Sequence, residues 1–106
     1  MTSQESTADE LHVVDNADAA RYELFLAGRR IGFVEYELGE GRILFPYIEV
    51  EPSMNGRGLG GYLTAWALGD CRRRGLRVSA RCPFVAEYIV SHPEYHDIAE
   101  NPATGR

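Results

Sequence analysis

Three extended runs joined by two very short turns constrain the fold of this chain more than any other feature. The runs cover residues 22–26, 31–38 and 42–50, where apolar side chains alternate with polar ones or cluster as they do in strands. Glycine marks both connections, Ala27-Gly28-Arg29 and Gly39-Glu40-Gly41. Connections this short exclude a crossover, so consecutive runs must pair antiparallel. The sequence therefore predicts an antiparallel meander.

Alternation in the second run also predicts which side chains share a face of the sheet. We expect Ile31, Phe33 and Glu35 on one face, and Val34, Tyr36 and Leu38 on the other. The third run contains Pro46, which has no N–H to donate to a ladder of backbone hydrogen bonds. A β-bulge or a locally open pairing is therefore expected at this residue.

The second half of the chain changes to helical periodicity. Apolar residues recur at helical spacing from residue 59 onward and predict a helix to about residue 74, which Gly75 ends. A strand over residues 76–82 and a second short helix over residues 85–91 follow. His92-Pro93 is expected to stop that helix, because the residue before a proline disfavours helical geometry.

This order of elements predicts one small α+β domain. A short strand at residues 11–14 precedes the meander, and helix, strand and helix then complete one mixed sheet. A chain of 106 residues fits a single domain, which we place at residues 11–97. Residues 1–10 are polar and acidic and are expected to form a disordered tail, and residues 98–106 a loose C-terminal tail.

Composition excludes several classes of function. The formal net charge is −5, which argues against nucleic-acid binding, and the chain has no lysine for a Schiff base or a P-loop. No apolar run approaches the roughly 20 residues that span a bilayer, and the N-terminus lacks the features of a signal peptide. Two cysteines argue against a disulfide scaffold. From these features together we expect a cytoplasmic protein without a membrane partner. We also expect no metal site.

A glycine-rich turn between the third run and the first helix is the strongest candidate for a binding site. It reads Asn55-Gly56-Arg57-Gly58-Leu59-Gly60. Glycines accept positive φ and let a ligand approach the backbone, while the following helix offers free N–H groups and the positive end of its dipole. Such a turn suits phosphate or pyrophosphate, and Arg57 would add a charged contact. The spacing differs from both the P-loop and the dinucleotide fingerprint.

Two motifs, in this order, resemble a known family. The strand ending in Glu49-Val50-Glu51-Pro52, the turn N-G-R-G-L-G and the helix after it are similar to the acyl-CoA signature of the GNAT acyltransferases, Q/R-x-x-G-x-G/A. The segment from Cys82 to Tyr95 resembles the CPFV-x-x-Y-I-x-x-HPEY segment of the small, single-domain YjdJ-type GNAT-like proteins. The resemblance covers residues 11–97 and implies a minimal GNAT-like fold that binds acetyl-CoA.

The resemblance also implies roles for individual residues. Glu49 matches a general base, and Tyr88 matches the acid that protonates the leaving CoA thiolate. Cys82 is expected beside the thioester and is an alternative to Tyr88 as that acid. The implied cofactor contacts are Val50, Asn55, Gly56, Arg57, Gly58, Leu59, Gly60, Gly61, Cys82, Pro83, Phe84, Tyr88 and His92. Asn55 departs from the Gln or Arg of the signature, and Tyr47-Ile48 stand where the subfamily often has His-Thr.

Three functions remain open at this level. The first is an N-acetyltransferase that moves acetyl from acetyl-CoA to an unidentified small-molecule or protein amine, with a backbone N–H between Pro46 and Val50 binding the carbonyl oxygen. A variant of this route makes Cys82 a nucleophile that needs His92 nearby as its base. The second is a non-catalytic acyl-CoA binding or sensing module, and the third an interaction protein without cofactor. A monomer or weak dimer is expected.

Overall fold

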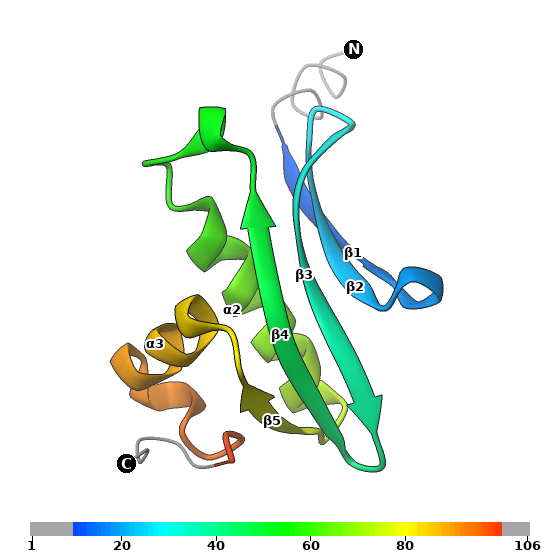
Figure 1. Cartoon of the computed structure of the whole chain (residues 1–106), viewed down its shortest axis with the longest axis vertical. Helices are drawn as coiled ribbons and strands as arrows, with labels where there is room; N and C mark the ends of the chain where they lie inside the picture. Colours follow the sequence, from blue (N-terminus) through cyan, green and yellow to red (C-terminus); the bar gives the residue numbers. More distant parts are fainter. Residues whose placement is uncertain (1–9, 101–106) are drawn as a thin grey trace.

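A five-stranded sheet organises the computed structural model, which describes residues 10–100 (Figure 1). The strands are β1 (Leu11–Asn16), β2 (Arg21–Leu26), β3 (Arg29–Gly39), β4 (Arg42–Val50) and β5 (Arg77–Ala80), in that spatial order. The helices are α2 (Leu59–Arg73) and α3 (Pro83–Ser91), with 3-10 turns η1 (Ala17–Ala19), η2 (Pro52–Met54) and η3 (Pro93–Tyr95). The first four strands pair antiparallel and β5 pairs parallel to β4, so the predicted mixed α+β sheet is confirmed.

The helix α2 crosses one face of the sheet and closes the hydrophobic core (Figure 1). Its apolar stripe at Leu59, Leu63 and Ala67 is buried, as the helical spacing predicts. Gly75 adopts φ +70° just after the helix, a conformation that glycine reaches without steric cost. The chain can therefore reverse direction directly into β5.

A buried polar network fixes the second half of α2 on the sheet. The Tyr22 hydroxyl donates to Asp70 Oδ2 at 2.7 Å, and Arg74 Nη1 donates to the same oxygen at 3.2 Å. The Tyr36 hydroxyl donates to Asp15 Oδ1 at 2.6 Å. Burial, assisted by the hydrogen bond to Asp15, raises the pKa of Tyr36 to about 12, so this phenol is a neutral donor at physiological pH.

The predicted division of β3 into two faces is wrong at Ile31. Leu24 pairs with Gly32 but Phe25 pairs with Arg30, so Ile31 is an extra residue in β3. This bulge turns Ile31 into the core together with Val34 and Tyr36, which are all buried. Simple alternation fails here because it assumes an uninterrupted period of two.

The bulge leaves the rest of the predicted alternation in place, since Phe33 and Val34 still lie on opposite faces of β3. Phe33 lies on the opposite face of the sheet from α2, beneath the guanidinium of Arg21 at 4.7 Å from the ring centroid. Leu38, expected on the same face as Val34 and Tyr36, has half of its surface exposed.

The irregularity expected at Pro46 is present and coincides with the end of the pairing between β4 and β5. Glu35 pairs with Tyr47 and Glu37 with Leu44, so Phe45 and Pro46 together oppose one residue of β3. On the other edge, β5 accompanies β4 only as far as the pair of Phe45 and Ala80. The C-terminal half of β4 therefore has a neighbouring strand on one edge only.

The C-terminal boundary predicted at residue 97 differs from the structure. The Val78 N–H donates to the Ile98 carbonyl at 2.8 Å, and the Glu100 N–H donates to the Val78 carbonyl at 2.7 Å. Ala99 is buried against the core. Residues 98–100 therefore belong to the domain. Residues 101–106 of the predicted C-terminal tail, and 1–9 of the N-terminal one, lie outside the described residues.

We expect the substitution Thr64→Val to stabilise the fold. Thr64 lies in α2 and is buried, and its hydroxyl has no hydrogen-bond partner within residues 10–100. Replacing an unsatisfied buried hydroxyl by a methyl of similar size should raise the free energy of unfolding by about 1 kcal/mol. Urea unfolding followed by circular dichroism measures this, with Thr64→Ser as a control that keeps the hydroxyl and loses the methyl. An unchanged or lower midpoint for Thr64→Val would contradict the prediction.

Candidate functional site

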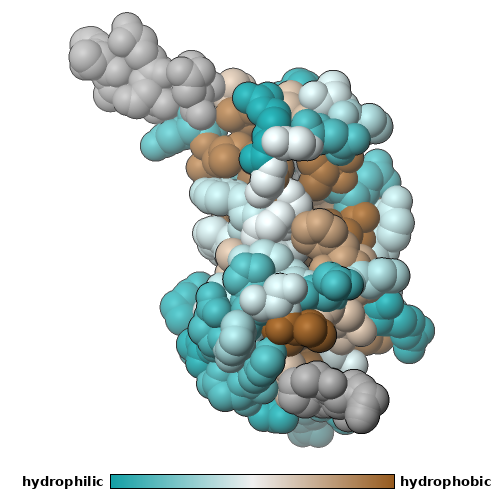
Figure 2. Space-filling model, turned by 90° about the vertical axis from the view of Figure 1, so that its left-hand side faces the viewer, coloured by the Kyte–Doolittle hydropathy of each residue, from teal (hydrophilic) through white to brown (hydrophobic). Residues whose placement is uncertain are grey.

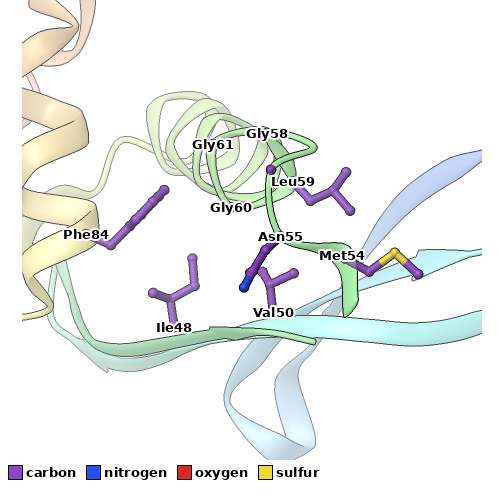
Figure 3. Close-up of a pocket in the computed structure, with 10 residues that line it drawn as sticks. Ile48, Val50, Met54, Asn55, Gly58, Leu59, Gly60, Gly61 and Phe84 are labelled. Carbon is purple, nitrogen blue, oxygen red and sulfur yellow. The ribbon is translucent and has the colours of Figure 1, made fainter. Parts of the chain in front are cut away.

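A cleft of about 440 Å³ lies between the open half of β4, the N-terminus of α2 and the start of α3. Figure 3 shows Ile48 and Val50 rising from β4 toward α2, with the Phe84 ring of α3 closing one side. The opposite side is formed by the chain from Met54 to Gly61, which includes the glycine-rich turn. The cleft thus combines an apolar floor with a wall of exposed backbone.

The glycine-rich turn presents backbone N–H groups to this cleft. Gly56 and Gly58 adopt φ of +83° and +73°, and Gly58 is the N-cap of α2 without any side-chain hydrogen bond to the helix. The first intrahelical bond runs from the Tyr62 N–H to the Gly58 carbonyl at 3.1 Å. The N–H groups of the three residues before Tyr62 are therefore left without a helical acceptor. Together with the helix dipole, they make an environment suited to an anion.

The open edge of β4 adds a second set of backbone donors. The Glu51 N–H donates to the Ile31 carbonyl at 2.9 Å, which fixes the direction of the backbone groups in this half of the strand. Because these groups alternate along a strand, the N–H groups of Ile48 and Val50 face away from β3, toward the edge that β5 leaves open. Ile48 and Val50 also line the cleft, so these donors border it.

Two glycines allow α3 to approach α2 closely beside the cleft. A Cβ atom placed on Gly60 would lie 3.0 Å from Cζ of Phe84, and one placed on Gly61 would lie 3.5 Å from Cε2 of Tyr88. Phe84 and Tyr88 are four residues apart and share one face of α3. A larger residue at position 60 would force the Phe84 ring to move, so the width of the cleft depends on this glycine.

Most of the predicted cofactor-binding positions line this cleft. They are Val50, Asn55, Gly56, Gly58, Leu59, Gly60, Gly61 and Phe84. Arg57 points its Nη1 at the sulfur of Met54, 3.1 Å away, and Pro83 is exposed outside the cleft. The sequence interpretation missed Ile48 and Met54, which also line it. Alternation along β4 would have found Ile48, since Val50 two residues later was predicted.

Glu49 lies on the other face of β4 from the cleft. Its side chain is exposed and accepts a hydrogen bond from the Tyr47 hydroxyl at 2.7 Å. This bond raises the pKa of Tyr47, which keeps the phenol protonated as a donor. The burial that would favour Glu49 as a base is therefore absent. Beyond Ala80, no strand within residues 10–100 pairs with the free edge of β4. Glu49 therefore lies beside this open edge.

Cys82 and His92 cannot act as a nucleophile and its base, because they lie at opposite ends of α3. Cys82 is the N-cap and His92 the C-cap of this nine-residue helix, which spans about 13 Å. Cys82 is 5% exposed and belongs to the hydrophobic core. The Cys82 N–H and the Arg81 N–H both donate to the Phe45 carbonyl at 3.0 Å. The variant route through a Cys82–His92 pair is thereby excluded.

Tyr88 and His92 contact one another instead. Their rings stack with centroids 3.8 Å apart and an interplanar angle of 12°. The His92 Nδ1 lies 2.7 Å from the Tyr88 carbonyl oxygen. Burial raises the pKa of Tyr88, with a further contribution from Tyr95. Neither ring lines the cleft, although Tyr88 lies directly behind Gly61.

The outer surface around α2 and α3 is mixed in character. Apolar side chains form separate patches down the middle of this face, between hydrophilic rims (Figure 2).

Within residues 10–100 the structure brings together no group of three or more His, Cys, Asp and Glu side chains fit to hold a metal ion. No helix of that same range is long and apolar enough to cross a membrane.

Comparison with known proteins gives the fold a family context. Residues 21–98 match the family model described as GCN5-related N-acetyl-transferase. The structure is similar to a GCN5-like protein from Staphylococcus aureus, with a TM-score of 0.66 and 16% identity over 89% of this chain and 90% of that one. No curated protein sequence matches the chain.

Two larger solved structures share part of this fold. The ribosomal-protein-S18-alanine N-acetyltransferase from Escherichia coli has a TM-score of 0.53 and 15% identity over 74% of this chain. Ard1 from Thermoplasma volcanium has a TM-score of 0.50 and 20% identity over 56%. The matched region spans 47% and 41% of these two proteins, so the likeness covers less than half of each.

We expect both thiols to resist labelling in the native protein. Cys71 is fully buried, which raises its pKa to about 12, and Cys82 is 5% exposed. Reaction with Ellman's reagent should be about tenfold or more slower than for the urea-unfolded chain, because the native protein must open first. The variant Cys71→Ala isolates Cys82 for this measurement. Rapid labelling of native Cys71→Ala protein would contradict the burial of Cys82.

Proposed function

The chain belongs to the GCN5-related N-acetyltransferase family, and from that premise we propose that it transfers an acetyl group from acetyl-CoA to an amine. The observation that carries the proposal is the glycine-rich turn at the start of α2, whose free N–H groups open onto a cleft beside the unpaired half of β4. The residues that line the cleft come both from this turn and from the open half of β4. The pyrophosphate and the thioester of an acyl-CoA molecule need these two kinds of surroundings.

The residues around the turn fit the pyrophosphate of CoA. Leu59, Gly60 and Gly61 would hold it through N–H groups that have no acceptor within the helix. Positive φ at Gly56 and Gly58 leaves the approach free of side chains. Arg57 is near enough along the chain to add a charge by leaving Met54. These features support binding by backbone rather than by a cluster of cations.

The open edge of β4 fits the thioester end. Bound acetyl-CoA would supply an activated acyl group there. The N–H group of Ile48 or Val50 would hydrogen bond the carbonyl oxygen and stabilise negative charge on it. On the other face, Glu49 would take a proton from the amine, and Tyr47 would orient the Glu49 carboxylate through its hydrogen bond. Tyr88 is the candidate donor of a proton to the departing sulfur, and its raised pKa keeps it protonated. Because its ring lies behind Gly61 and not in the cleft wall, it would have to turn toward the cleft to do so.

The acceptor would approach from the face of the sheet that carries Glu49. That face lies opposite α2, and the side chains of Tyr47 and Glu49 are exposed on it. A small-molecule or protein amine would meet the acyl group through the open edge, without crossing the cleft that would hold CoA.

The two unpaired cysteines support a reducing, cytoplasmic setting. A monomer or weak dimer would suffice, because the site uses one chain.

We expect Gly58→Glu to abolish binding of acetyl-CoA and CoA. The substitution places a side chain and a negative charge at the N-cap of α2, where φ is +73°. Isothermal titration should show micromolar or tighter binding for the parent protein and none for the variant. Gly41→Glu is the matched control, since Gly41 has φ +71° in the turn between β3 and β4, away from the cleft. Both variants carry a similar backbone cost, of about 1 kcal/mol. Equal binding by Gly58→Glu and the parent would place the cofactor elsewhere.

We expect Glu49→Gln to separate catalysis from binding. Glu49 lies across the sheet from the cleft, so the affinity for acetyl-CoA should stay within about twofold. Turnover with a panel of amines, followed by CoA release, should fall by about a hundredfold because the proton acceptor is lost. The control is Glu51→Gln, a residue that pairs with Arg29 at the surface. Binding of acetyl-CoA without turnover of any amine by the parent protein would favour a non-catalytic acyl-CoA sensing module.

A further inference from the structure

A buried carboxylate lies on the face of the sheet opposite α2, where the acceptor would approach. Glu23 of β2 is only 6% exposed, although the residues on either side of it point into the core. Its Oε2 atom accepts hydrogen bonds from Asn16 at 3.2 Å, Arg21 at 2.7 Å and Arg30 at 3.2 Å. Burial opposes the charge of Glu23, but these hydrogen bonds outweigh it and lower the pKa of the carboxyl. Glu23 is therefore ionised, and two arginines share it.

Both arginines converge on one aromatic ring of β3. The guanidinium carbon of Arg21 lies 4.7 Å from the Phe33 ring centroid, and that of Arg30 lies 5.8 Å from it. The strand partner of Arg21 is Glu35, but its guanidinium turns toward Glu23. Arg21 donates through Nε and Arg30 through Nη1, so their remaining N–H groups have no protein acceptor within residues 10–100. Two cations share one carboxylate, which leaves positive charge and free donors over Phe33.

The same face is negative on the side of β4. In the register of β3 and β4, Glu35 pairs with Tyr47 and Phe33 pairs with Glu49. The two carboxylates thus occupy one diagonal of this group, and the two rings occupy the other. The Phe33 and Tyr47 ring centroids are 6.1 Å apart, and the Tyr47 hydroxyl donates to Glu49 Oε1 at 2.7 Å. A continuous surface therefore leads from the guanidinium groups to the candidate base.

The positive and negative sides of this surface are two strands apart. Arg21 lies in β2 and Glu49 in β4, with Phe33 of β3 between them. Neighbouring strands are about 4.8 Å apart, so the two charges are separated by roughly 10 Å at the backbone. Because the Arg21 side chain leans over Phe33, the gap between the charged groups is shorter. A chain of about four to six carbon atoms fits this gap once a hydrogen bond of about 2.9 Å is added at each end.

We propose that the acceptor is a zwitterionic amine, whose carboxylate binds Arg21 and Arg30 while its amine lies beside Glu49. This inference rests on the proposed function, since Glu49 acts as a base only if an acetyl group is transferred. A carboxylate matches the planar fork of a guanidinium. Glu23 and the Phe33 ring hold both guanidinium groups in place before the ligand arrives, which lowers the entropic cost of binding.

The chemistry of the transfer is the same for any amine. The amine nitrogen forms a bond to the acetyl carbon as the bond between that carbon and sulfur breaks. A proton of the amine passes to Glu49, and the sulfur leaves as a thiolate that takes up a proton. The carboxylate of the acceptor takes no part in these steps and contributes only to its binding and orientation.

Three acceptors of one chain length test the proposal: 5-aminopentanoate, pentylamine and 1,5-diaminopentane. Each has five carbon atoms and one primary amine, and the other end is a carboxylate, a methyl group or a second ammonium. With acetyl-CoA, kcat/KM for 5-aminopentanoate should exceed that for pentylamine about tenfold, the value of a charge-assisted hydrogen bond. The diamine should be no better than pentylamine, because Arg21 and Arg30 repel its second charge. A diamine that matches or exceeds 5-aminopentanoate would overturn the proposal.

Variants connect this preference to the arginines. Arg21→Gln should reduce the ratio of kcat/KM for 5-aminopentanoate over pentylamine to about two or less. The ratio is taken within each variant, so a general loss of activity from a disturbed fold cancels. Arg29→Gln is the matched control, since it removes the same charge from an exposed arginine that pairs with Glu51, and it should keep the parent ratio within about twofold. If Arg21→Gln does not fold, the more exposed Arg30→Gln decides in the same way.

The outcomes separate this inference from the proposed function. Equal kcat/KM for 5-aminopentanoate and pentylamine in the parent would overturn the acceptor class and leave acetyl transfer in place. Failure to bind acetyl-CoA in the titration described above would overturn the proposed function by itself. If the parent turns over none of the three amines, nuclear magnetic resonance of the Arg21 Nε–H group, which its bond to Glu23 protects, decides. A shift with millimolar 5-aminopentanoate and none with pentylamine is expected, and no shift with either would overturn the carboxylate site.

Discussion

The parting of β4 from β5 is the constraint on which the candidate site depends. The Phe45 carbonyl accepts hydrogen bonds from two successive N–H groups, those of Arg81 and Cys82, and this ends the ladder between the two strands. Pro46 follows at once, and with no N–H to donate it cannot resume the pairing. The chain after Cys82 turns away as α3, so the rest of β4 keeps an unpaired edge. The cleft and the backbone donors of β4 that border it exist because that edge is left open.

The site that results is built mainly from backbone. Free N–H groups come from the start of α2 and from the open edge of β4, while none of the described residues that line the cleft has a charged side chain. This explains how a chain of net charge −5 can carry a candidate site for a polyanionic cofactor. The dipoles of the backbone amides act on the ligand at short range. The acidic side chains elsewhere on the surface are farther away, and salt screens their repulsion. Glycine is needed at such a site because a side chain would keep the ligand from the amides.

Local signals in the sequence predicted the features that depend on local geometry. The meander, the glycine-rich turn and the irregularity at Pro46 each follow from a few adjacent residues, and the structure contains all three. The bulge at Ile31 was missed although Gly32, a residue type that often marks a bulge inside a strand, follows it directly. The separation of Cys82 from His92 could have been predicted from the length of the helix expected between them. The motif indicates which residues are present, but not how far apart they lie. Ile48 was missed although alternation with Val50 indicated it.

In the proposed function, the cofactor and the acceptor bind on opposite faces of the sheet. The α2 side would hold the cofactor, and the exposed face that carries Glu49 would receive the acceptor, so the two partners need not compete for one pocket. Backbone donors at the open edge do not change with side-chain substitution, whereas Tyr47, Glu49 and other exposed residues can change with little effect on the core. The proposed cofactor half of the site would therefore be tied to the fold. The acceptor half can vary on the same scaffold, because its residues project from strands whose opposite face is fixed by the packing of α2.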